Sequence, residues 1–183
     1  MNKEILVVDD NSDIRLLISS ILKDKGFDVR EAANFDQAKN EIDTKIPNVA
    51  VIDVKLDKGD NDGIELLSYL KKKDEDIPVI MISGHANVQM AVDSLKMGAF
   101  EFLQKPFSSE RFLNFVNRAV ENLDLKKEKQ VLESKLFHSY DIIGESHSIE
   151  KVKSLITKLS GTESRVFISG PAGSGKELVA RQI

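Results

Sequence analysis

The sequence predicts a doubly wound α/β fold, built on a five-stranded parallel sheet, for the larger, N-terminal part of the chain. Short apolar runs alternate there with segments of helical periodicity, the pattern of repeated strand–helix units. Three runs are continuously apolar, as expected for strands that helices cover on both faces; they occupy residues 5–8, 49–52 and 79–82. Two others, residues 28–32 and 99–103, mix polar and apolar side chains and are therefore expected at the sheet edges. The predicted strand order is 2-1-3-4-5, and a parallel sheet of different order is the competing arrangement.

Helices are expected between these strands. The first has a candidate N-cap in Asn11 or Ser12 and a terminating glycine in Gly26. Its apolar residues repeat with helical spacing, at Ile14, Leu17, Ile18, Ile21 and Leu22. Further helices are predicted near residues 34–43, 63–72 and 87–96, and from Ser108 onward. The helix at 87–96 carries its apolar residues on one face, at Val88, Ala91, Val92 and Leu95.

The last helix of this domain is expected to continue through the next segment as one rod, because its apolar stripe enters a charged stretch without a glycine or proline. The apolar positions do not hold a strict heptad, so both a solvated helix and a coiled coil remain open. The chain thus divides into a domain at 1–121, a helical linker at 122–139 and a remainder at 140–183. The remainder is expected to begin with a short amphipathic helix and to contain a strand at 165–169.

Composition excludes several classes of protein. The 183 residues are 41% hydrophobic and 31% charged, as in soluble globular proteins. A net charge of -4 gives no basic footprint for nucleic acid. The absence of cysteine excludes disulfide, thiolate and zinc–thiolate chemistry. Because neither a signal peptide nor a membrane-spanning run is found, a cytoplasmic protein without a membrane partner is expected.

Chemically compatible side chains stand where the predicted strands end. They are Asp9 and Asp10 after the first strand, Asp53 after the third, Ser83 after the fourth and Lys105 after the fifth. Taken singly, each has an ordinary structural role, such as a helix cap or a turn. Because the carboxyl ends of parallel strands meet at one edge, where ligands bind, the five side chains are expected to converge.

The residue types suit phosphoryl chemistry. Three neighbouring carboxylates repel one another and favour a hard cation with oxygen ligands, such as Mg²⁺. With that charge neutralised, Asp53 would attack a phosphoryl group as a carboxylate nucleophile. Lys105 would stabilise the transferred group electrostatically, and the Ser83 hydroxyl would donate a hydrogen bond to one of its oxygens. The sequence therefore predicts an aspartate that becomes phosphorylated.

These residues resemble the receiver domains of two-component response regulators. The resemblance covers residues 1 to about 121 and rests on Val8-Asp9-Asp10, Asp53, Ser83-Gly84 and Lys105-Pro106-Phe107. It implies a flavodoxin-like (CheY-like) sheet and a histidine kinase as the phosphoryl donor. It also implies a homodimer formed through the receiver and the linker helix.

The resemblance assigns further roles. It implies that Asp10 and Asp53 bind Mg²⁺ directly, together with the backbone carbonyl of Lys55, while Asp9 acts through water. It also implies a cis peptide bond between Lys105 and Pro106. Phe102 falls at the family's aromatic switch position, where the ring moves inward as the phosphoryl group is engaged, although phenylalanine lacks the hydroxyl of tyrosine.

The sequence departs from the family after the phosphorylated aspartate. Residues 56–63 are two residues longer than usual and lack proline. A calcium loop would place Lys58 and Tyr69 at its first and twelfth ligand positions, so a solvated acidic loop is expected instead. In the receiver fold, Lys55 and His85 flank the path of the attacking water. Neither suits the orienting of water, so slow self-hydrolysis of the phosphorylated state is expected.

A glycine-rich loop of the pattern G-x-x-x-x-G-K extends from Gly170 to Lys176, between a predicted strand and a helix. Backbone N–H groups around Gly173 and Gly175 would approach phosphates, and the lysine would reach further along them. Glu177 replaces the usual serine or threonine, which removes the hydroxyl ligand for Mg²⁺.

This loop, together with residues 143–146, resembles the ATPase domain of sigma-54-dependent activators. The two parts jointly resemble the NtrC family and, within it, the NtrX branch. Residues 140–183 then correspond to a truncated N-terminal part of an AAA+ domain, with a vestigial nucleotide site. ATP, sigma-54 RNA polymerase and DNA are expected as ligands and partners only of a full-length parent. The chain itself is expected to catalyse only its own phosphorylation and dephosphorylation.

Two other functions compete with a phosphoryl-accepting receiver that switches a sigma-54-type output. A haloacid-dehalogenase-like phosphatase also uses an aspartate nucleophile, Mg²⁺, serine and lysine. That family requires a second aspartate two residues beyond the nucleophile, where this chain has Lys55 after Asp53 and Asn11 after Asp9. The second competitor is an ATP-driven transcription activator, a function that applies to the full-length parent.

Overall fold

The computed structural model describes residues 3–57, 59, 61–84, 88–138, 142–162 and 165–183. It divides into two compact units, Met1–Lys127 and Glu128–Ile183.

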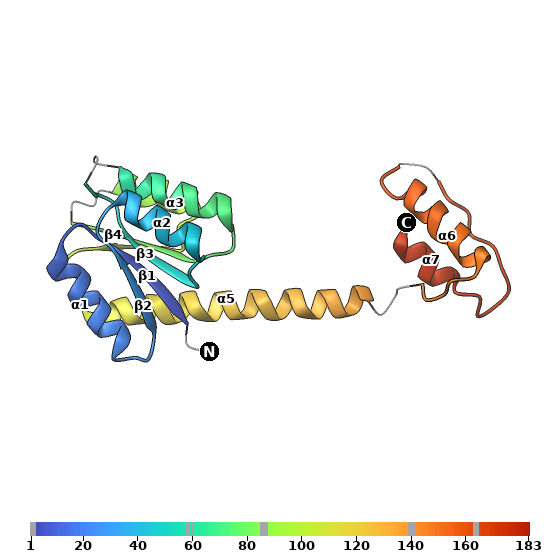
Figure 1. The fold of residues 1–183 in the computed structure, drawn as a ribbon, viewed down its shortest axis with the longest axis horizontal. Helices are drawn as coiled ribbons and strands as arrows, with labels where there is room; N and C mark the ends of the chain where they lie inside the picture. The colour runs from blue at the N-terminus through green and yellow to red at the C-terminus, as the bar shows by residue number, and fades with distance from the viewer. Residues whose placement is uncertain (1–2, 58, 60, 85–87, 139–141, 163–164) are drawn as a thin grey trace. The chain divides into compact units, whose positions relative to one another are not determined.

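The first unit contains a five-stranded, all-parallel sheet in the order β2-β1-β3-β4-β5 (Figure 1). Its strands are β1 (Glu4–Val8), β2 (Asp28–Ala32), β3 (Val49–Asp53), β4 (Val79–Ser83) and β5 (Glu101–Gln104). The predicted order is therefore confirmed. The two strands of mixed composition lie at the edges, and the three continuously apolar strands lie inside.

Helices cover both faces of the sheet. They are α1 (Ser12–Lys23), α2 (Phe35–Thr44), α3 (Asp62–Lys73), α4 (Val88–Lys96) and α5 (Ser109–His138). Figure 1 shows α2 and α3 on one face and α1 and α5 on the other. The predicted cap of the first helix is confirmed, because the Asn11 side chain accepts hydrogen bonds from the N–H groups of Asp13 and Ile14. Gly26, with a φ of 82°, follows in the turn beyond that helix.

The alternation of side chains along the central strands builds two apolar layers. In β1, Leu6 and Val8 belong to the layer under α2 and α3, whereas Ile5 and Val7 belong to the layer under α1 and α5. Because both faces of this strand are buried, it is apolar throughout. The rigid centre of the domain thus fixes the strand ends that carry the polar residues.

Helix α4 turns its apolar stripe towards solvent. Val88, Val92 and Leu95 share one face, as the sequence indicates, but 83% of Val88 and 44% of Leu95 are exposed. The inward side is formed by Met90, which packs on the core, and by Ser94, which is fully buried. The Ser94 hydroxyl donates a 2.8 Å hydrogen bond to the carbonyl of Met90, so its burial leaves no unpaired polar group.

Helix α5 is one continuous rod of 30 residues, as predicted. Its first turns pack on the sheet through Phe112, Val116 and Ala119. Beyond the sheet, Asp124 pairs with Lys3, and Lys126 pairs with Asp76 at 2.6 Å. These ion pairs join this part of α5, which still belongs to the first unit, to the segments that precede β1 and β4.

The second unit contains α6 (His147–Leu159) and α7 (Lys176–Gln182). The predicted amphipathic helix is confirmed, with Ser146 as its N-cap. The predicted strand at 165–169 is wrong, because residues 165–170 have no regular structure. A strand needs a neighbour to pair its backbone groups, and the described part of this unit contains no other strand. None of the described helices in either unit has the length and apolar character needed to cross a membrane.

Candidate functional site

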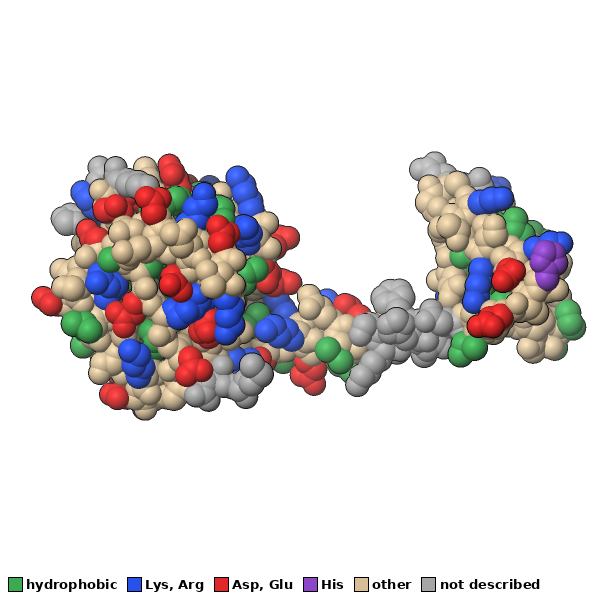
Figure 2. Space-filling view, in the orientation of Figure 1, with side chains coloured by type: hydrophobic (Ala, Val, Ile, Leu, Met, Phe, Trp, Pro, Cys, Tyr) green, Lys and Arg blue, Asp and Glu red, His purple; other side chains and the backbone are tan. Residues whose placement is uncertain are grey.

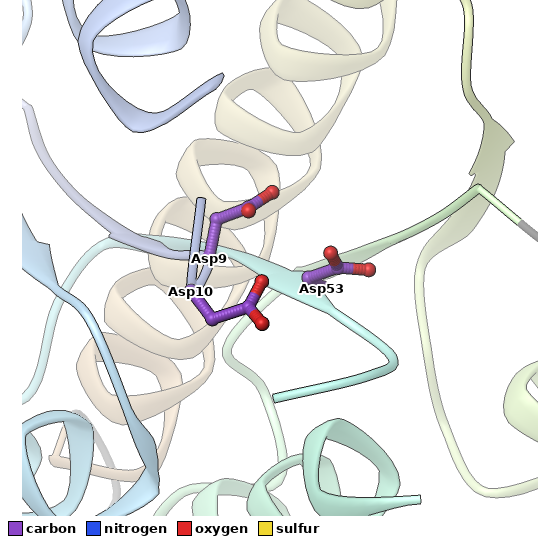
Figure 3. A group of neighbouring side chains, drawn as sticks. All are labelled: Asp9, Asp10 and Asp53. Atoms are coloured by element: carbon purple, nitrogen blue, oxygen red, sulfur yellow. The ribbon is translucent and has the colours of Figure 1, made fainter. Parts of the chain in front are cut away.

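Three carboxylates meet at the carboxyl edge of the sheet (Figure 3). Asp9 and Asp10 follow β1 directly, and Asp53 is the last residue of β3. One carboxylate oxygen from each lies within 4.8 Å of the others. Only 2% of Asp9 and 7% of Asp53 are exposed, whereas Asp10 is open to solvent. The predicted convergence of the acids is therefore present in the fold.

Lys105, which directly follows the edge strand β5, extends its side chain to this acidic group. Its Nζ donates hydrogen bonds of 2.6 Å to Asp9 Oδ2 and 2.7 Å to Asp53 Oδ2. Its backbone N–H donates to the carbonyl of Ser83 at 2.8 Å, so the end of β4 fixes its position. The peptide bond to Pro106 is cis, as the family resemblance implied.

Asp9 and Asp10 differ in how much of their bonding capacity is already used. Asp9 Oδ1 accepts a 3.0 Å hydrogen bond from the N–H of Asn11, and its Oδ2 accepts the bond from Lys105. The Asp10 carboxylate forms no hydrogen bond with any residue that the structure describes. Asp10 is therefore the freer of the two to bind a cation.

The electrostatics of the site favour an added cation. Burial raises the pKa of Asp53, and the charge of Asp9 adds to this effect against the opposing hydrogen bond from Lys105. Burial alone would lower the pKa of Lys105, but its hydrogen bonds to Asp53 and Asp9 outweigh burial and raise it. The Lys105 ammonium thus pairs with Asp9 and Asp53, and the neighbouring Asp10 adds a third carboxylate. Oxygen donors with excess negative charge are suitable ligands for Mg²⁺.

A cavity of about 570 Å³ opens over these residues. Besides the acids and Lys105, its walls include Lys55, Ser83 and Gly84. The backbone of Lys55 also acts to lower the pKa of Asp53, against the effect of burial. Ser83, which is buried at the end of β4, stands one strand away from Asp53. The cavity has room for a phosphoryl group between the acceptor, the hydroxyl and the ammonium.

Phe102 does not line this cavity. It lies half-buried on β5, paired in register with Met81 of β4, and packs on the layer that contains α4 Met90. It therefore packs on the same core layer as Met90, which also lines the cavity. His85, expected to influence hydrolysis, lies outside the described residues, as do Lys58 and Asp60 of the acidic loop.

The acidic loop is less solvated than the sequence suggested. Asp62 is nearly buried and accepts a 2.7 Å hydrogen bond from the N–H of Gly59. Asp57 accepts a 3.3 Å hydrogen bond from the N–H of Phe35 at the start of α2. The prediction of a solvated loop therefore holds for Asp57, which is exposed, and is wrong for Asp62, whose carboxylate is nearly buried and accepts a backbone hydrogen bond. Next to them, a Cβ on Gly63 would lie 1.9 Å from the Asp53 carbonyl, so only glycine allows α3 to begin there.

Arg15 contacts the acid pair, a role that no motif in the sequence signals. Its Nη1 donates hydrogen bonds to the backbone carbonyls of Asp9 at 2.7 Å and Asp10 at 3.3 Å. Since every residue type has a carbonyl, no residue pattern identifies such an acceptor.

The glycine-rich loop forms in the second unit. Gly173 and Gly175 have φ angles of 77° and 80°, which glycine adopts without strain. The Lys176 Nζ donates hydrogen bonds to the carbonyls of Gly170 at 2.9 Å and Pro171 at 2.6 Å. The Lys176 ammonium is thus hydrogen-bonded to the glycine-rich loop itself. The same ammonium would contact a phosphate bound in that loop. Glu177 pairs with Arg181 at 2.7 Å.

Both units match known families. Residues 5–117 match the family model described as response regulator receiver domain, and residues 142–183 match the one described as sigma-54 interaction domain. The nitrogen assimilation regulatory protein NtrX of Azorhizobium caulinodans is 40% identical over 183 residues, which cover all of this chain and 40% of that protein. The chain thus spans well under half the length of this relative.

Solved structures agree with these matches. A crystal structure of NtrX from Brucella abortus in complex with ADP is 38% identical, with a TM-score of 0.69, and covers 100% of this chain and 40% of that one. A solution structure of the beryllofluoride-activated NtrC4 receiver domain dimer is 38% identical, with a TM-score of 0.61. It covers 66% of this chain and 98% of that one.

Proposed function

Because this chain belongs to the response regulator receiver domain family, we propose that Asp53 accepts a phosphoryl group from a histidine kinase in the presence of Mg²⁺. The observation that carries the proposal is the convergence on Asp53 of the Lys105 ammonium, at 2.7 Å, and of two further carboxylates. The cavity above them provides space for the incoming group.

The donor set fits Mg²⁺. Asp10 and Asp53 would bind it directly together with the Lys55 carbonyl, and Asp9 would act through water. This division is supported by the hydrogen bonds that occupy both carboxylate oxygens of Asp9, while Asp10 remains open. When bound, the metal neutralises charge on the phosphoryl oxygens.

The protein's own residues then position the transfer. A carboxylate oxygen of Asp53 attacks the phosphorus, a P–O bond forms, and the P–N bond to the donor histidine breaks with its electron pair on the imidazole nitrogen. Lys105 pairs with a phosphoryl oxygen, and the Ser83 hydroxyl donates to another. Hydrolysis of the acyl phosphate by water returns Asp53 to its carboxylate form.

Phosphorylation switches the surface formed by α4, β5 and α5. Ser83 and Phe102 connect the site to this surface, and ligation stabilises one of two pre-existing states. The exposed apolar face of α4 then forms a homodimer together with the linker part of α5. The solved NtrC4 receiver, described as a beryllofluoride-activated dimer, supports this part of the proposal.

The receiver occupies residues 1–121, the linker 122–139, and the start of the output domain 140–183. The sigma-54 interaction match over residues 142–183 supports an output that acts with sigma-54 RNA polymerase on DNA in a longer, cytoplasmic protein. Charges of both signs are interspersed on the face of the first unit that Figure 2 shows, which suits a regulatory domain better than a nucleic-acid surface. This chain itself does not hydrolyse ATP, so its phosphate release does not change on Lys176→Ala.

Intact-mass measurement tests the central proposal. Incubation with acetyl phosphate should add one phosphoryl group to the wild type only when Mg²⁺ is present, and none to Asp53→Asn. Equal uptake by the two proteins contradicts the assignment. Multiple turnover of a phosphate ester would instead favour a phosphatase.

A further inference from the structure

We propose that Arg15 is a positioning residue that holds the two acids of the β1–α1 loop in place for Mg²⁺. The inference rests on the proposed function, because it concerns how the metal-binding carboxylates are oriented. It starts from the two hydrogen bonds that Arg15 Nη1 donates to the carbonyls of Asp9, at 2.7 Å, and Asp10, at 3.3 Å.

The loop is held only partly by secondary structure. The N–H of Asp9 donates to the carbonyl of Ala32 in β2 at 3.3 Å, which joins the start of this segment to the sheet. Helix α1 begins three residues later, where the N–H of Arg15 donates to the carbonyl of Asn11 at 3.0 Å. Asp10 lies between these two anchors. The guanidinium of Arg15 supplies the bond that ties its backbone to the helix.

Arginine suits this task better than lysine. Its guanidinium is planar, stays protonated and carries five N–H donors in fixed directions, so one end can bind two neighbouring carbonyls. An ammonium on a flexible stem retains the charge but not this geometry. The side chain is half-buried, and its anchored backbone restricts where the guanidinium can go. Residues that orient metal ligands in this way affect affinity although they do not touch the metal.

A positioning role for Arg15 differs in its consequences from a role in helix stability or in charge alone. If Arg15 served only the stability of α1, its replacement would lower the melting temperature but leave the Mg²⁺ affinity of the folded protein unchanged. If it acted only through its positive charge beside three carboxylates, it would weaken rather than strengthen cation binding, and Arg15→Lys would behave as the wild type. The positioning role alone requires weaker binding in both Arg15→Lys and Arg15→Gln.

The test is a Mg²⁺ titration of the 183-residue chain by ¹H–¹⁵N NMR, following the amide of Asn11. The spectrum also shows that each variant is folded, so the dissociation constant refers to folded molecules. We expect Arg15→Lys and Arg15→Gln to raise the Kd for Mg²⁺ about tenfold. Lys23→Met, which removes a charge from the exposed last turn of the same helix, should leave the Kd within about twofold.

Acetyl phosphate labelling provides a second readout. For Arg15→Lys, the rate at low Mg²⁺ should fall by the same factor as the affinity and recover at saturating Mg²⁺, because the nucleophile Asp53 is untouched. The proposal is overturned if both variants have the wild-type Kd for Mg²⁺. It is also overturned if Arg15→Lys alone has the wild-type Kd. If the wild type binds Mg²⁺ in an Arg15-dependent manner but takes up no phosphate, the proposed function fails while this inference stands.

Discussion

The ammonium of Lys105 and the carboxylate of Asp53 are 2.7 Å apart, although the two residues are 52 positions apart in the sequence. The same ammonium binds Asp9 at 2.6 Å, so one cation serves two buried acids. The parallel sheet creates this contact, because it brings the ends of β1, β3 and β5 to one edge. The lysine is therefore both a structural counter-charge and a partner for the phosphoryl group.

Replacing Lys105 with methionine should destabilise the metal-free protein. Two buried carboxylates would lose a charged hydrogen-bond donor, and we expect the free energy of unfolding to fall by about 2 kcal/mol at pH 7. Urea unfolding without Mg²⁺ measures this change. The matched control is Lys96→Met on the exposed end of α4, for which the change should stay within about 0.5 kcal/mol. Equal urea midpoints for Lys105→Met and the wild type would show that the ammonium does not stabilise the site.

Glu4 should make stability depend on pH. It accepts hydrogen bonds from Arg30 Nε at 2.9 Å and from Lys45 Nζ at 2.7 Å. Burial alone would raise the pKa of Glu4, but the bond from Lys45 and the charges of Arg30 and Lys45 outweigh it and lower the pKa. A carboxyl group with a lowered pKa in the folded state stabilises the fold above its unfolded pKa, about 4.3. This contribution disappears as the pH falls through the folded value.

The Glu4→Gln variant tests this linkage. At pH 7 its free energy of unfolding should be about 1 kcal/mol lower than that of the wild type. At about pH 3, below the unfolded pKa of the carboxyl group, this difference should be smaller. Urea unfolding at both pH values provides the comparison. Glu121→Gln, an exposed change on α5, serves as the control. A Glu4→Gln difference of the same size at both pH values would exclude the carboxylate as its source.

Ser19 is a buried residue whose polar group is not satisfied. Only 2% of it is exposed, and its hydroxyl has no hydrogen-bond partner among the described residues. Ser19→Ala should therefore raise the free energy of unfolding by about 1 kcal/mol. Ser94→Ala is the matched control, because it makes the same change in a helix but removes a hydroxyl bonded to Met90. In thermal unfolding, Ser19→Ala should raise the melting temperature and Ser94→Ala should not. A lower melting temperature for Ser19→Ala would show that the hydroxyl contributes to stability.

The apolar face of α4 should carry the dimer. Leu95→Glu places a charge on this face without disturbing the core, because the side chain is 44% exposed and belongs to neither core layer. We expect beryllofluoride and Mg²⁺ to dimerise the wild type and the variant to dimerise about tenfold more weakly. Light scattering over a concentration series measures the two affinities. Leu16→Glu, at an exposed apolar position on α1, should behave as the wild type. Equal dimerisation by Leu95→Glu would exclude the α4 face.

The sheet and the site could be predicted because their signals are carried by residue type. Strands buried on both faces must be apolar throughout, and Asp9, Asp53 and Lys105 mark where three of the strands end. The orientation of α4 could not be predicted, because Val88, Val92 and Leu95 have the spacing of a core stripe while the buried position is a serine. Interaction surfaces can have the same apolar spacing as core faces.

The other features that the sequence did not predict depend on contacts with backbone groups or on a neighbouring strand. Residue types do not reveal such contacts. The apolar segment at 165–169 has the composition of a strand, but strand formation depends on a neighbour, and none is present among the described residues of its unit. Asp62 was predicted to be solvated although it is nearly buried, because a partner of its carboxylate is a backbone N–H group. The role of Arg15 escapes sequence analysis for the corresponding reason, since it binds backbone carbonyls.

The most direct measurement is the position of the phosphoryl group itself. The wild-type chain is treated with acetyl phosphate and Mg²⁺, the acyl phosphate is reduced with borohydride, and the digested protein is sequenced by mass spectrometry. Reduction converts a phosphorylated aspartate to homoserine. We predict homoserine at position 53 alone, and no converted residue when Mg²⁺ is omitted. Conversion at Asp9 or Asp10, or an unconverted Asp53 in protein that has gained the mass of a phosphate, would contradict Asp53 as the acceptor.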